Sequence, residues 1–169
     1  MLLMQVVDAR LPEHYRGDVD VPPSPVVVEA LTAAASVTPC RPLLRGHMPS
    51  AVNVPWTSVV DRQSGVRLLD RRRLVRDVFQ TAGVDVGRPL TVTGYVGDTA
   101  CLVALAAVHC GARDVAVYTG SWTEWAQLAD RRLIAVGGDG GGGLAICPTL
   151  CGSSKTEFLS IVADLRRKG

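Results

Sequence analysis

Short apolar runs alternate with longer helical patterns through the first 130 residues of the chain. The apolar runs have the length of buried strands, and they occupy residues 4–7, 51–54, 90–93 and 115–118. Between and after them, apolar residues recur at helical spacing over 70–83, 99–110 and from Ser121 onward. This alternation predicts an α/β domain in which helices flank both faces of a parallel sheet.

The three helical patterns differ in how much apolar surface they carry. The first has a single stripe and is bounded by Asp70 as N-cap and Gly83 as C-cap. The second is apolar all round, so we expect it to be buried on most sides, with Cys101 packed inside the fold. The third starts at a capping box formed by Ser121 and Glu124.

The composition changes after residue 130. Glycines dominate 137–143 and predict a linker. A further helix is expected from a second capping box at Ser154, and its apolar stripe comprises Phe158, Ile161, Val162 and Leu165. We therefore divide the chain into a domain over 1–130 and an appendage over 131–169 whose helix docks by that stripe. A separate Pro-rich connection over 18–45 could hold one more helix at 26–35.

Charge and cysteine content narrow the function classes. The net charge of +2 over 169 residues is too small to indicate nucleic-acid or membrane-surface binding. No run of 18 apolar residues is present, and residues 1–7 lack the basic start of a signal peptide. The five cysteines, Cys40, Cys101, Cys110, Cys147 and Cys151, are odd in number and irregularly spaced. They predict reduced thiols and a cytoplasmic protein, with no metal site and no cofactor.

The segment most suggestive of chemistry is the loop between the strand at 90–93 and the helix at 99–110. It reads Gly94-Tyr95-Val96-Gly97-Asp98-Thr99. A tight loop running from a strand into a helix turns backbone N–H groups toward one point above the helix N-terminus, which favours an anion. We expect this cradle of N–H groups to be present here.

Four motifs, in order, resemble the rhodanese and 3-mercaptopyruvate sulfurtransferase family. They are Val7-Asp8-Ala9-Arg10 followed by Tyr15-Arg16-Gly17, then Gly46-His47-Met48-Pro49-Ser50-Ala51-Val52-Asn53-Val54-Pro55, then the loop from Gly94 to Cys101, and finally Tyr118-Thr119-Gly120-Ser121-Trp122-Thr123-Glu124-Trp125. The resemblance covers residues 4 to about 129 and implies a rhodanese-like domain of the C-terminal type found in two-domain sulfurtransferases. Most of the matched residues have structural interpretations: His47 as a hydrogen-bonded loop residue, Trp122 and Trp125 as core anchors, and Asp8 with Arg10 as a tie between strand and loop.

The loop departs from the family at one decisive position. The family pattern Cys-x-x-Gly-x-Thr is matched by Gly97 and Thr99, but Gly94 stands where the resemblance places the nucleophilic cysteine. A glycine has no atom that can carry sulfur as a persulfide. Asp98 adds a negative charge that opposes an incoming anion by roughly 1 kcal/mol or more at short range.

The substrate contacts implied by the resemblance are also altered. His14 occupies the position of a carboxylate-binding arginine, and Arg41 is the candidate for a second such contact. The resemblance further implies a site shared between two domains, so pairing with a second rhodanese domain is expected.

These observations predict a sulfurtransferase-family domain that has lost its catalytic cysteine and acts as a binding or regulatory module, with a small sulfur-containing anion or a protein partner as its ligand. The alternative is an active thiosulfate or 3-mercaptopyruvate sulfurtransferase that uses Cys151 or a cysteine from a partner. Cys151-Gly152-Ser153-Ser154-Lys155-Thr156 follows an apolar run and resembles an active loop, and Lys155 would lower the thiol pKa.

Overall fold

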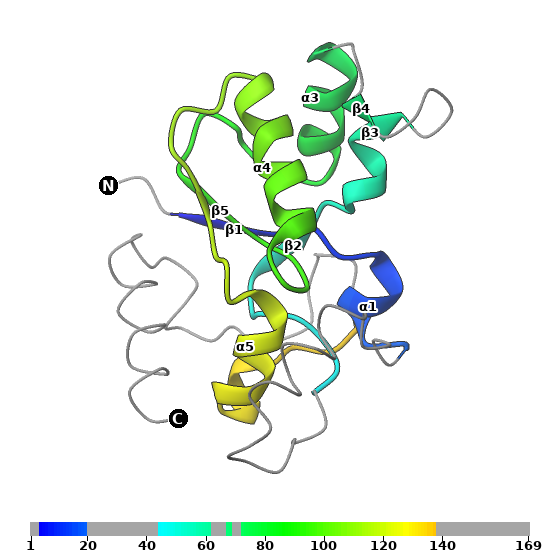
Figure 1. Cartoon of the computed structure of the whole chain (residues 1–169), viewed down its shortest axis with the longest axis vertical. Helices are drawn as coiled ribbons and strands as arrows, with labels where there is room; N and C mark the ends of the chain where they lie inside the picture. Colours follow the sequence, from blue (N-terminus) through cyan, green and yellow to red (C-terminus); the bar gives the residue numbers. More distant parts are fainter. Residues whose placement is uncertain (1–3, 20–43, 62–66, 69–71, 138–169) are drawn as a thin grey trace.

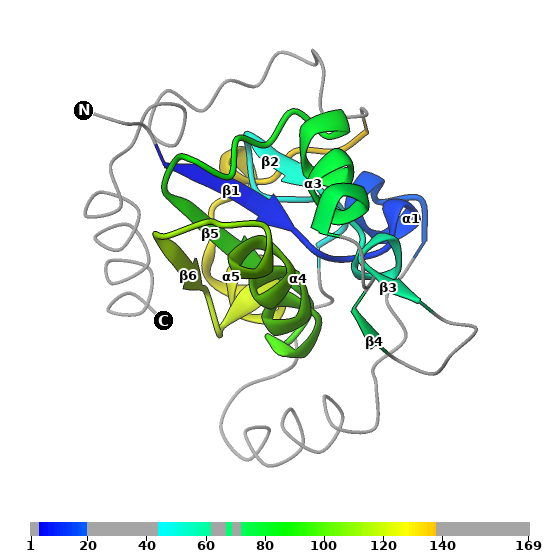
Figure 2. The same ribbon diagram turned by 90° about the horizontal axis from the view of Figure 1, so that it is seen from above.

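A four-stranded parallel sheet forms the centre of the computed structural model, which describes residues 4–19, 44–61, 67–68 and 72–137. Its strands are β1 (Gln5–Asp8), β2 (Ala51–Asn53), β5 (Leu90–Thr93) and β6 (Val115–Val117). Figure 1 shows the whole chain, and Figure 2 labels the four strands in their order β2-β1-β5-β6. The register pairs Val7 with Val52 on one side and with Val92 on the other. The crossovers between these parallel strands are long enough to hold helices.

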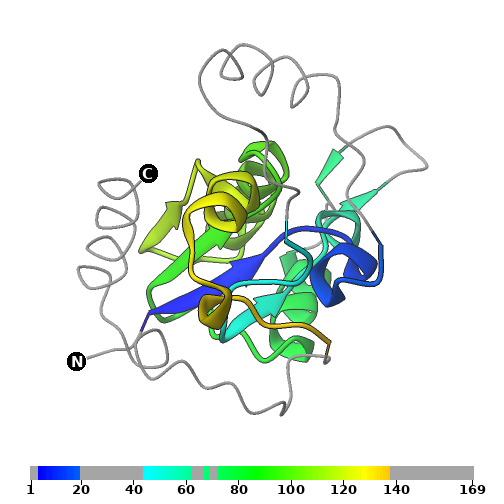
Figure 3. The ribbon, with the colours of Figure 1, turned by 90° about the horizontal axis from the view of Figure 1, so that it is seen from below.

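The sheet separates two apolar clusters because successive side chains of a strand point to opposite faces. Val7, Leu90 and Val92 pack with α3 (Arg72–Thr81) and α4 (Asp98–His109). Met4 and Val6 face the other cluster, which includes residues of α1 (Pro12–Arg16) and α5 (Ser121–Leu128). Two opposite views agree, with α4 in front of the sheet from above and α5 in front of it from below (Figures 2 and 3). The predicted parallel sheet with helices on both faces is thereby confirmed.

Several short elements were not expected from the sequence. They are α1, the 3₁₀ turns η1 (Trp56–Ser58) and η2 (Arg131–Leu133), and an antiparallel pair of two-residue strands, β3 (Val60–Asp61) and β4 (Arg67–Leu68). Of these, α1 had a readable signal, since proline is favoured at the first helical position and Pro12 occupies it.

The predicted strands, and the helices predicted over 70–83 and 99–110, agree with the observed strands and with α3 and α4 to within a residue or two. Gly83 follows α3 with φ of +80°, as a residue ending a helix often does. The expected N-cap Asp70, the helix at 26–35 and the appendage from residue 138 lie outside the described residues. No helix in the described part of the chain is both long and apolar enough to cross a bilayer.

The expectation that α4 is buried on most sides was wrong for one face. Ala100, Val103 and Ala107 are buried against the sheet, but Leu105 is 54% exposed and Val108 is 52% exposed. Cys101, which we expected to be packed inside, is exposed as well. A helix covering one face of a sheet buries only the side turned toward it, so apolar composition alone did not reveal the exposed side.

The predicted capping box of α5 was also wrong, although the helix does begin at Ser121. Gly120 is the N-cap residue, and no side chain caps the helix. The Ser121 hydroxyl instead donates to the Tyr118 carbonyl, and the Glu124 carboxylate accepts a hydrogen bond from the Tyr118 hydroxyl. Both side chains of the box therefore bond Tyr118 rather than the N–H groups at the start of the helix.

Residues 131–137 lie against the sheet domain. Backbone hydrogen bonds join His47 and Ala135 in both directions, at 2.8 Å and 2.9 Å. The indole nitrogen of Trp125 donates to the Leu133 carbonyl at 2.8 Å. Gly46, with φ of +115°, allows this approach because a Cβ there would overlap the Ala135 carbonyl oxygen.

Candidate functional site

The loop from Gly94 to Gly97 lies at the carboxyl end of β5 and leads directly into α4. This is the edge of a parallel sheet where α/β proteins usually place their ligands. Gly97 has φ of +104°, a conformation that L-residues rarely adopt, and its carbonyl accepts the Cys101 N–H at 3.0 Å. The glycine therefore allows the sharp entry into the helix.

The start of α5 holds the loop in place through four hydrogen bonds. The Gly94 N–H donates to the Ser121 hydroxyl at 3.1 Å, and the Gly94 carbonyl accepts from the Trp122 N–H at 3.1 Å. The Tyr95 carbonyl accepts from both the N–H and the hydroxyl of Thr123, at 3.2 Å and 2.7 Å. Because these bonds use the first N–H groups of α5, that helix end is occupied by the loop.

The backbone at position 94 leaves little room for a side chain. A Cβ on Gly94 would lie 2.6 Å from the Thr99 hydroxyl oxygen and 3.1 Å from the Ala100 nitrogen. The hydroxyl could turn away cheaply, whereas the backbone contact would require a shift of a few tenths of an ångström. The loop has thus closed on the place from which a side chain would project.

Asp98 carries a negative charge at the first turn of α4. Its carboxylate is exposed and accepts a hydrogen bond from the Thr99 N–H at 2.6 Å. A carboxylate at a helix N-terminus is stabilised by the helix dipole. It occupies one N–H group that an external anion would otherwise use.

Asp8 and Arg10 form the tie between strand end and loop that the sequence predicted. The Arg10 Nη2 lies 2.7 Å from Asp8 Oδ2 in a fully buried ion pair, and it also donates to the Gly46 carbonyl at 2.7 Å. The guanidinium stacks over the Trp122 ring, with 4.3 Å between the guanidinium carbon and the ring centroid. Arg10 therefore links β1, the segment at Gly46 and α5.

Five side-chain donors near this edge lack a hydrogen-bond partner among the described residues. They are Arg10 Nη1, the hydroxyls of Thr93, Tyr95 and Thr99, and the Trp122 indole nitrogen, and each of these atoms is buried. Burial raises the pKa of Tyr95, while the Arg10 charge acts in the opposite direction. Buried polar groups are nearly always paired, so these donors are open to a ligand or to water.

His47 is a structural residue, as the sequence suggested. It is buried, its Nδ1 lies 2.8 Å from the Tyr15 carbonyl oxygen, and its ring stacks on Tyr15 at 3.8 Å between centroids. Burial lowers the pKa of His47, and the Tyr15 carbonyl and the Asp8 charge act against that shift. Trp122 and Trp125, at 1% and 0% exposure, are likewise core anchors.

The remaining candidates are not brought to the loop. His14 lies in the last turn of α1, half-buried, and no hydrogen bond among the described residues joins it to the loop. Arg41 and Cys151 lie outside the described residues. The described thiols are Cys101 on the exposed side of α4 and the buried Cys110.

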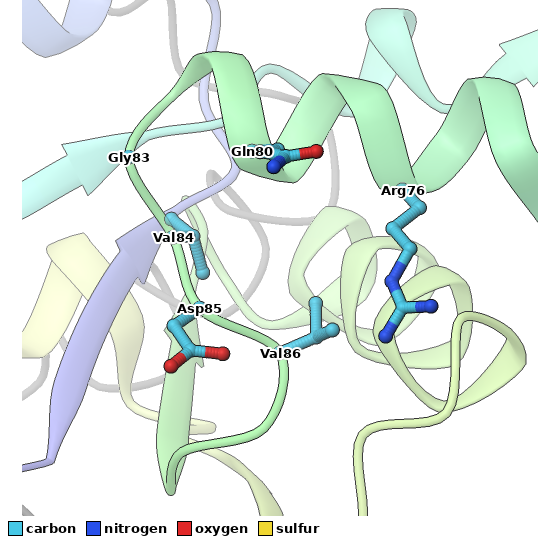
Figure 4. A pocket seen from close by; sticks show the side chains of 6 residues that line it. All are labelled: Arg76, Gln80, Gly83, Val84, Asp85 and Val86. Atoms are coloured by element: carbon cyan, nitrogen blue, oxygen red, sulfur yellow. The ribbon is translucent and has the colours of Figure 1, made fainter.

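A hollow of about 600 Å³ opens at the opposite edge of the sheet (Figure 4). It is lined by Arg76 and Gln80 of α3 and by the segment from Gly83 to Val86 that leads toward β5. The Gln5 amide, at the start of β1, bonds the backbone of Asp85 in both directions. The hollow therefore lies at the amino edge, away from the loop.

Sequence reasoning missed the contributions of Ser121 and Thr123 to the site. Ser121 is fully buried with φ of +52°, an uncommon conformation for a residue with a side chain. The motif around Gly120 was noticed, but local capping rules explained its residues without involving the loop. Only the tertiary structure brings residues 27 positions apart into contact.

Comparison with known proteins agrees with this architecture. The family described as Rhodanese-like domain matches residues 2–128. The chain is 36% identical over 125 residues to human 3-mercaptopyruvate sulfurtransferase, covering 74% of this chain and 35% of that protein. It is 42% identical over 84 residues to chicken thiosulfate sulfurtransferase, covering 50% of this chain and 28% of that protein.

Among solved structures, the sub-stoichiometric sulfur transferase subunit of yeast mitochondrial complex I aligns with a TM-score of 0.60 at 27% identity, over 80% of this chain and 39% of that one. Tum1 from Saccharomyces cerevisiae aligns with a TM-score of 0.60 at 19% identity, over 79% of this chain and 40% of that one. This likeness supports the fold and nothing more. The chain thus spans well under half the length of these relatives. The fold, the matched family and the related sulfurtransferases together show that the chain belongs to the rhodanese-like domain family.

Proposed function

We propose that this chain is a catalytically degenerate member of the sulfurtransferase family. It retains the loop of the family but does not itself carry sulfur. One observation carries the proposal: position 94 has no side chain, and a Cβ there would lie 2.6 Å from the Thr99 hydroxyl and 3.1 Å from the Ala100 nitrogen. Sulfur transfer through an enzyme persulfide needs a thiolate at that point.

The described thiols do not replace the missing one. Cys101 is exposed on α4 and Cys110 is buried at the far end of the same helix. Neither belongs to the loop between β5 and α4.

The role proposed for the domain is binding. Arg10 Nη1 and the Tyr95 hydroxyl are buried donors without a partner among the described residues, and Arg10 carries a positive charge. A small sulfur-containing anion such as thiosulfate fits this chemistry, with the Asp98 carboxylate limiting its affinity. A protein partner, including a second rhodanese domain, is the other proposed ligand. The cytoplasm is the proposed compartment, in keeping with the free thiols.

The test is a turnover assay on the purified chain with thiosulfate and cyanide, and with 3-mercaptopyruvate and a thiol acceptor. We expect no product above the protein-free control. Turnover near 1 per second or faster, the range of ordinary enzymes, would contradict the proposal.

A rescue variant tests whether the loop is otherwise intact. The double variant Gly94→Cys with Asp98→Asn should take up sulfane sulfur from thiosulfate, while Gly94→Ser with Asp98→Asn should not. The serine variant is a matched control because it introduces a side chain of similar size with no thiol. Absence of the persulfide in a folded Gly94→Cys variant would show that the loop no longer supports the chemistry.

The second candidate is a sulfurtransferase that uses Cys151. It is favoured by the sequence Cys151-Gly152-Ser153-Ser154, which resembles the family's loop pattern with Ser154 in place of its glycine, and by the neighbouring Lys155. A Cys151 that reacts with iodoacetamide at pH 6 much faster than free cysteine would support it.

A further inference from the structure

The exposed face of α4 is an apolar strip that nothing in the described residues covers. Cys101, Leu105 and Val108 follow one another at intervals of four and three residues, so they lie on one side of the helix. Leu105 and Val108 are each more than half exposed. Figures 1 and 2 show α4 lying across the sheet, so the side opposite the sheet faces outward.

The chain contains a second apolar strip of the same length. Phe158, Ile161, Val162 and Leu165 span seven positions at helical spacing, as Cys101 to Val108 do. If helical, each strip measures about 10 Å along its axis. These tail residues lie outside the described part of the chain, and their helical spacing is a property of the sequence.

We propose that residues 154–168 dock on the exposed face of α4 in the same molecule, antiparallel to α4. The tail would then cover Cys101 and bring its basic end to the loop that precedes the helix.

The charge at the N-terminal end of α4 selects this direction. Asp98 is exposed at that end, whereas the exposed Arg113 and Asp114 just beyond the C-terminal end balance each other. The tail pattern has the balanced pair Lys155 and Glu157 before its strip and three basic residues, Arg166, Arg167 and Lys168, after it. Antiparallel docking sets Asp98 beside the basic end of the tail, whereas parallel docking would leave Asp98 beside a balanced pair and lose that attraction.

The size of the strip favours a tethered segment over a free partner. Three partly exposed side chains offer at most a few hundred Å², whereas a stable interface needs about 800 Å² from each partner. A tethered segment is present at a high effective concentration and can dock through a smaller area.

The segment that joins Gly137 to the tail is long enough for the tail to reach α4. The described chain ends at Gly137, whose N–H donates to the Arg16 carbonyl beside α1. Residues 138–153 can span about 50 Å when extended, and a domain of this size is about 35–40 Å across. The tail can therefore reach α4 from Gly137.

Carbodiimide cross-linking of the full chain tests both docking and direction. Lys155 and Lys168 are the only lysines in the sequence, and both lie in the tail. We expect an Asp98–Lys168 amide that persists on dilution. An Asp98–Lys155 amide would overturn the antiparallel direction, and a product that disappears on dilution would overturn docking within one molecule in favour of a second copy.

Alkylation of Cys101, followed by peptide mapping, gives an independent measurement. Ile161→Asp should release the tail and raise the Cys101 rate by about tenfold or more, while Ser160→Asp, on the opposite side of the predicted helix, should leave it unchanged. Equal rates in the native chain and both variants would overturn the proposal. Leu105→Asp is the reciprocal variant, and it should leave the core packing unchanged because Leu105 is more than half exposed. It should speed tryptic cleavage at Lys155, and an unchanged rate would count equally against docking.

Discussion

Gly46→Ala tests the close contact between the segment at Gly46 and residues 131–137. The new Cβ would overlap the Ala135 carbonyl oxygen and would lie 3.0 Å from the Ala135 carbonyl carbon and 3.2 Å from Val136 Cγ2. Since the nearest atoms are backbone, the segment must move. Its movement would break the two hydrogen bonds between His47 and Ala135, which measure 2.8 Å and 2.9 Å.

The expected loss combines two effects. A side chain at φ of +115° costs roughly 1–2 kcal/mol, and each lost backbone bond costs about 1 kcal/mol. We therefore expect the free energy of unfolding to fall by about 3–4 kcal/mol, a large share of the 5–15 kcal/mol typical of a domain.

Gly111→Ala is the matched control. Gly111 has φ of +101°, but a Cβ there meets nothing within 4 Å. It should show only the conformational cost, so the two variants should differ by about 2 kcal/mol.

Urea unfolding followed by tryptophan fluorescence measures this difference, because Trp122 and Trp125 are buried in the folded state. A gap of about 2 kcal/mol corresponds to a midpoint shift of roughly 1 M urea. Equal losses in the two variants would refute the reasoning, since the overlap with Ala135 would then have no energetic consequence.

Three further predictions concern Gly120, His47 and Asp98. Gly120→Ala should destabilise the domain by about 1–2 kcal/mol, because its Cβ would overlap the Glu124 carboxylate that bonds Tyr118. In a double-mutant cycle measured by urea unfolding, adding Glu124→Ala should remove most of this extra loss. Full additivity of the two losses would contradict the contact. Folding lowers the pKa of His47, so as the pH falls the unfolded chain binds a proton at His47 before the folded chain does. The free energy of unfolding should therefore fall as the pH drops below 6.5, and His47→Gln should flatten that slope. An unchanged slope would show that His47 is not its source. Asp98→Asn should tighten thiosulfate binding by about fivefold in calorimetry, because it removes the negative charge beside the Thr99 N–H. Equal or weaker binding would contradict an anion site at the loop.

The sequence predicted the elements of the fold that depend on periodicity. The apolar runs at 51–54 and 90–93 and the helix ending before Gly83 needed no tertiary information, because their patterns match a single type of structure. The exposed face of α4 could not be predicted in this way, since an apolar residue pattern carries no sign of which side meets the sheet. Leu105 and Ala104 are both apolar, and only packing makes one exposed and the other buried.

The location of the candidate loop could be predicted from the sequence, but its geometry could not. Gly94 can be read from the sequence, whereas the 2.6 Å between its Cβ position and the Thr99 hydroxyl depends on how the loop closes. Ser121 and Glu124 fit a capping box by spacing, yet Ser121 bonds the distant Gly94, and Glu124 bonds Tyr118, which precedes the helix. Capping rules fail where a residue has a better partner outside its own helix.

The central claim is that this chain does not form a persulfide. Mass spectrometry of the native protein after treatment with thiosulfate or 3-mercaptopyruvate, with peptide mapping of all five cysteines, tests it most directly. The account predicts no cysteine carrying an added sulfur atom, while Gly94→Cys with Asp98→Asn carries one at position 94. A native chain with stoichiometric sulfur on Cys151, or on any other of its own cysteines, would contradict it.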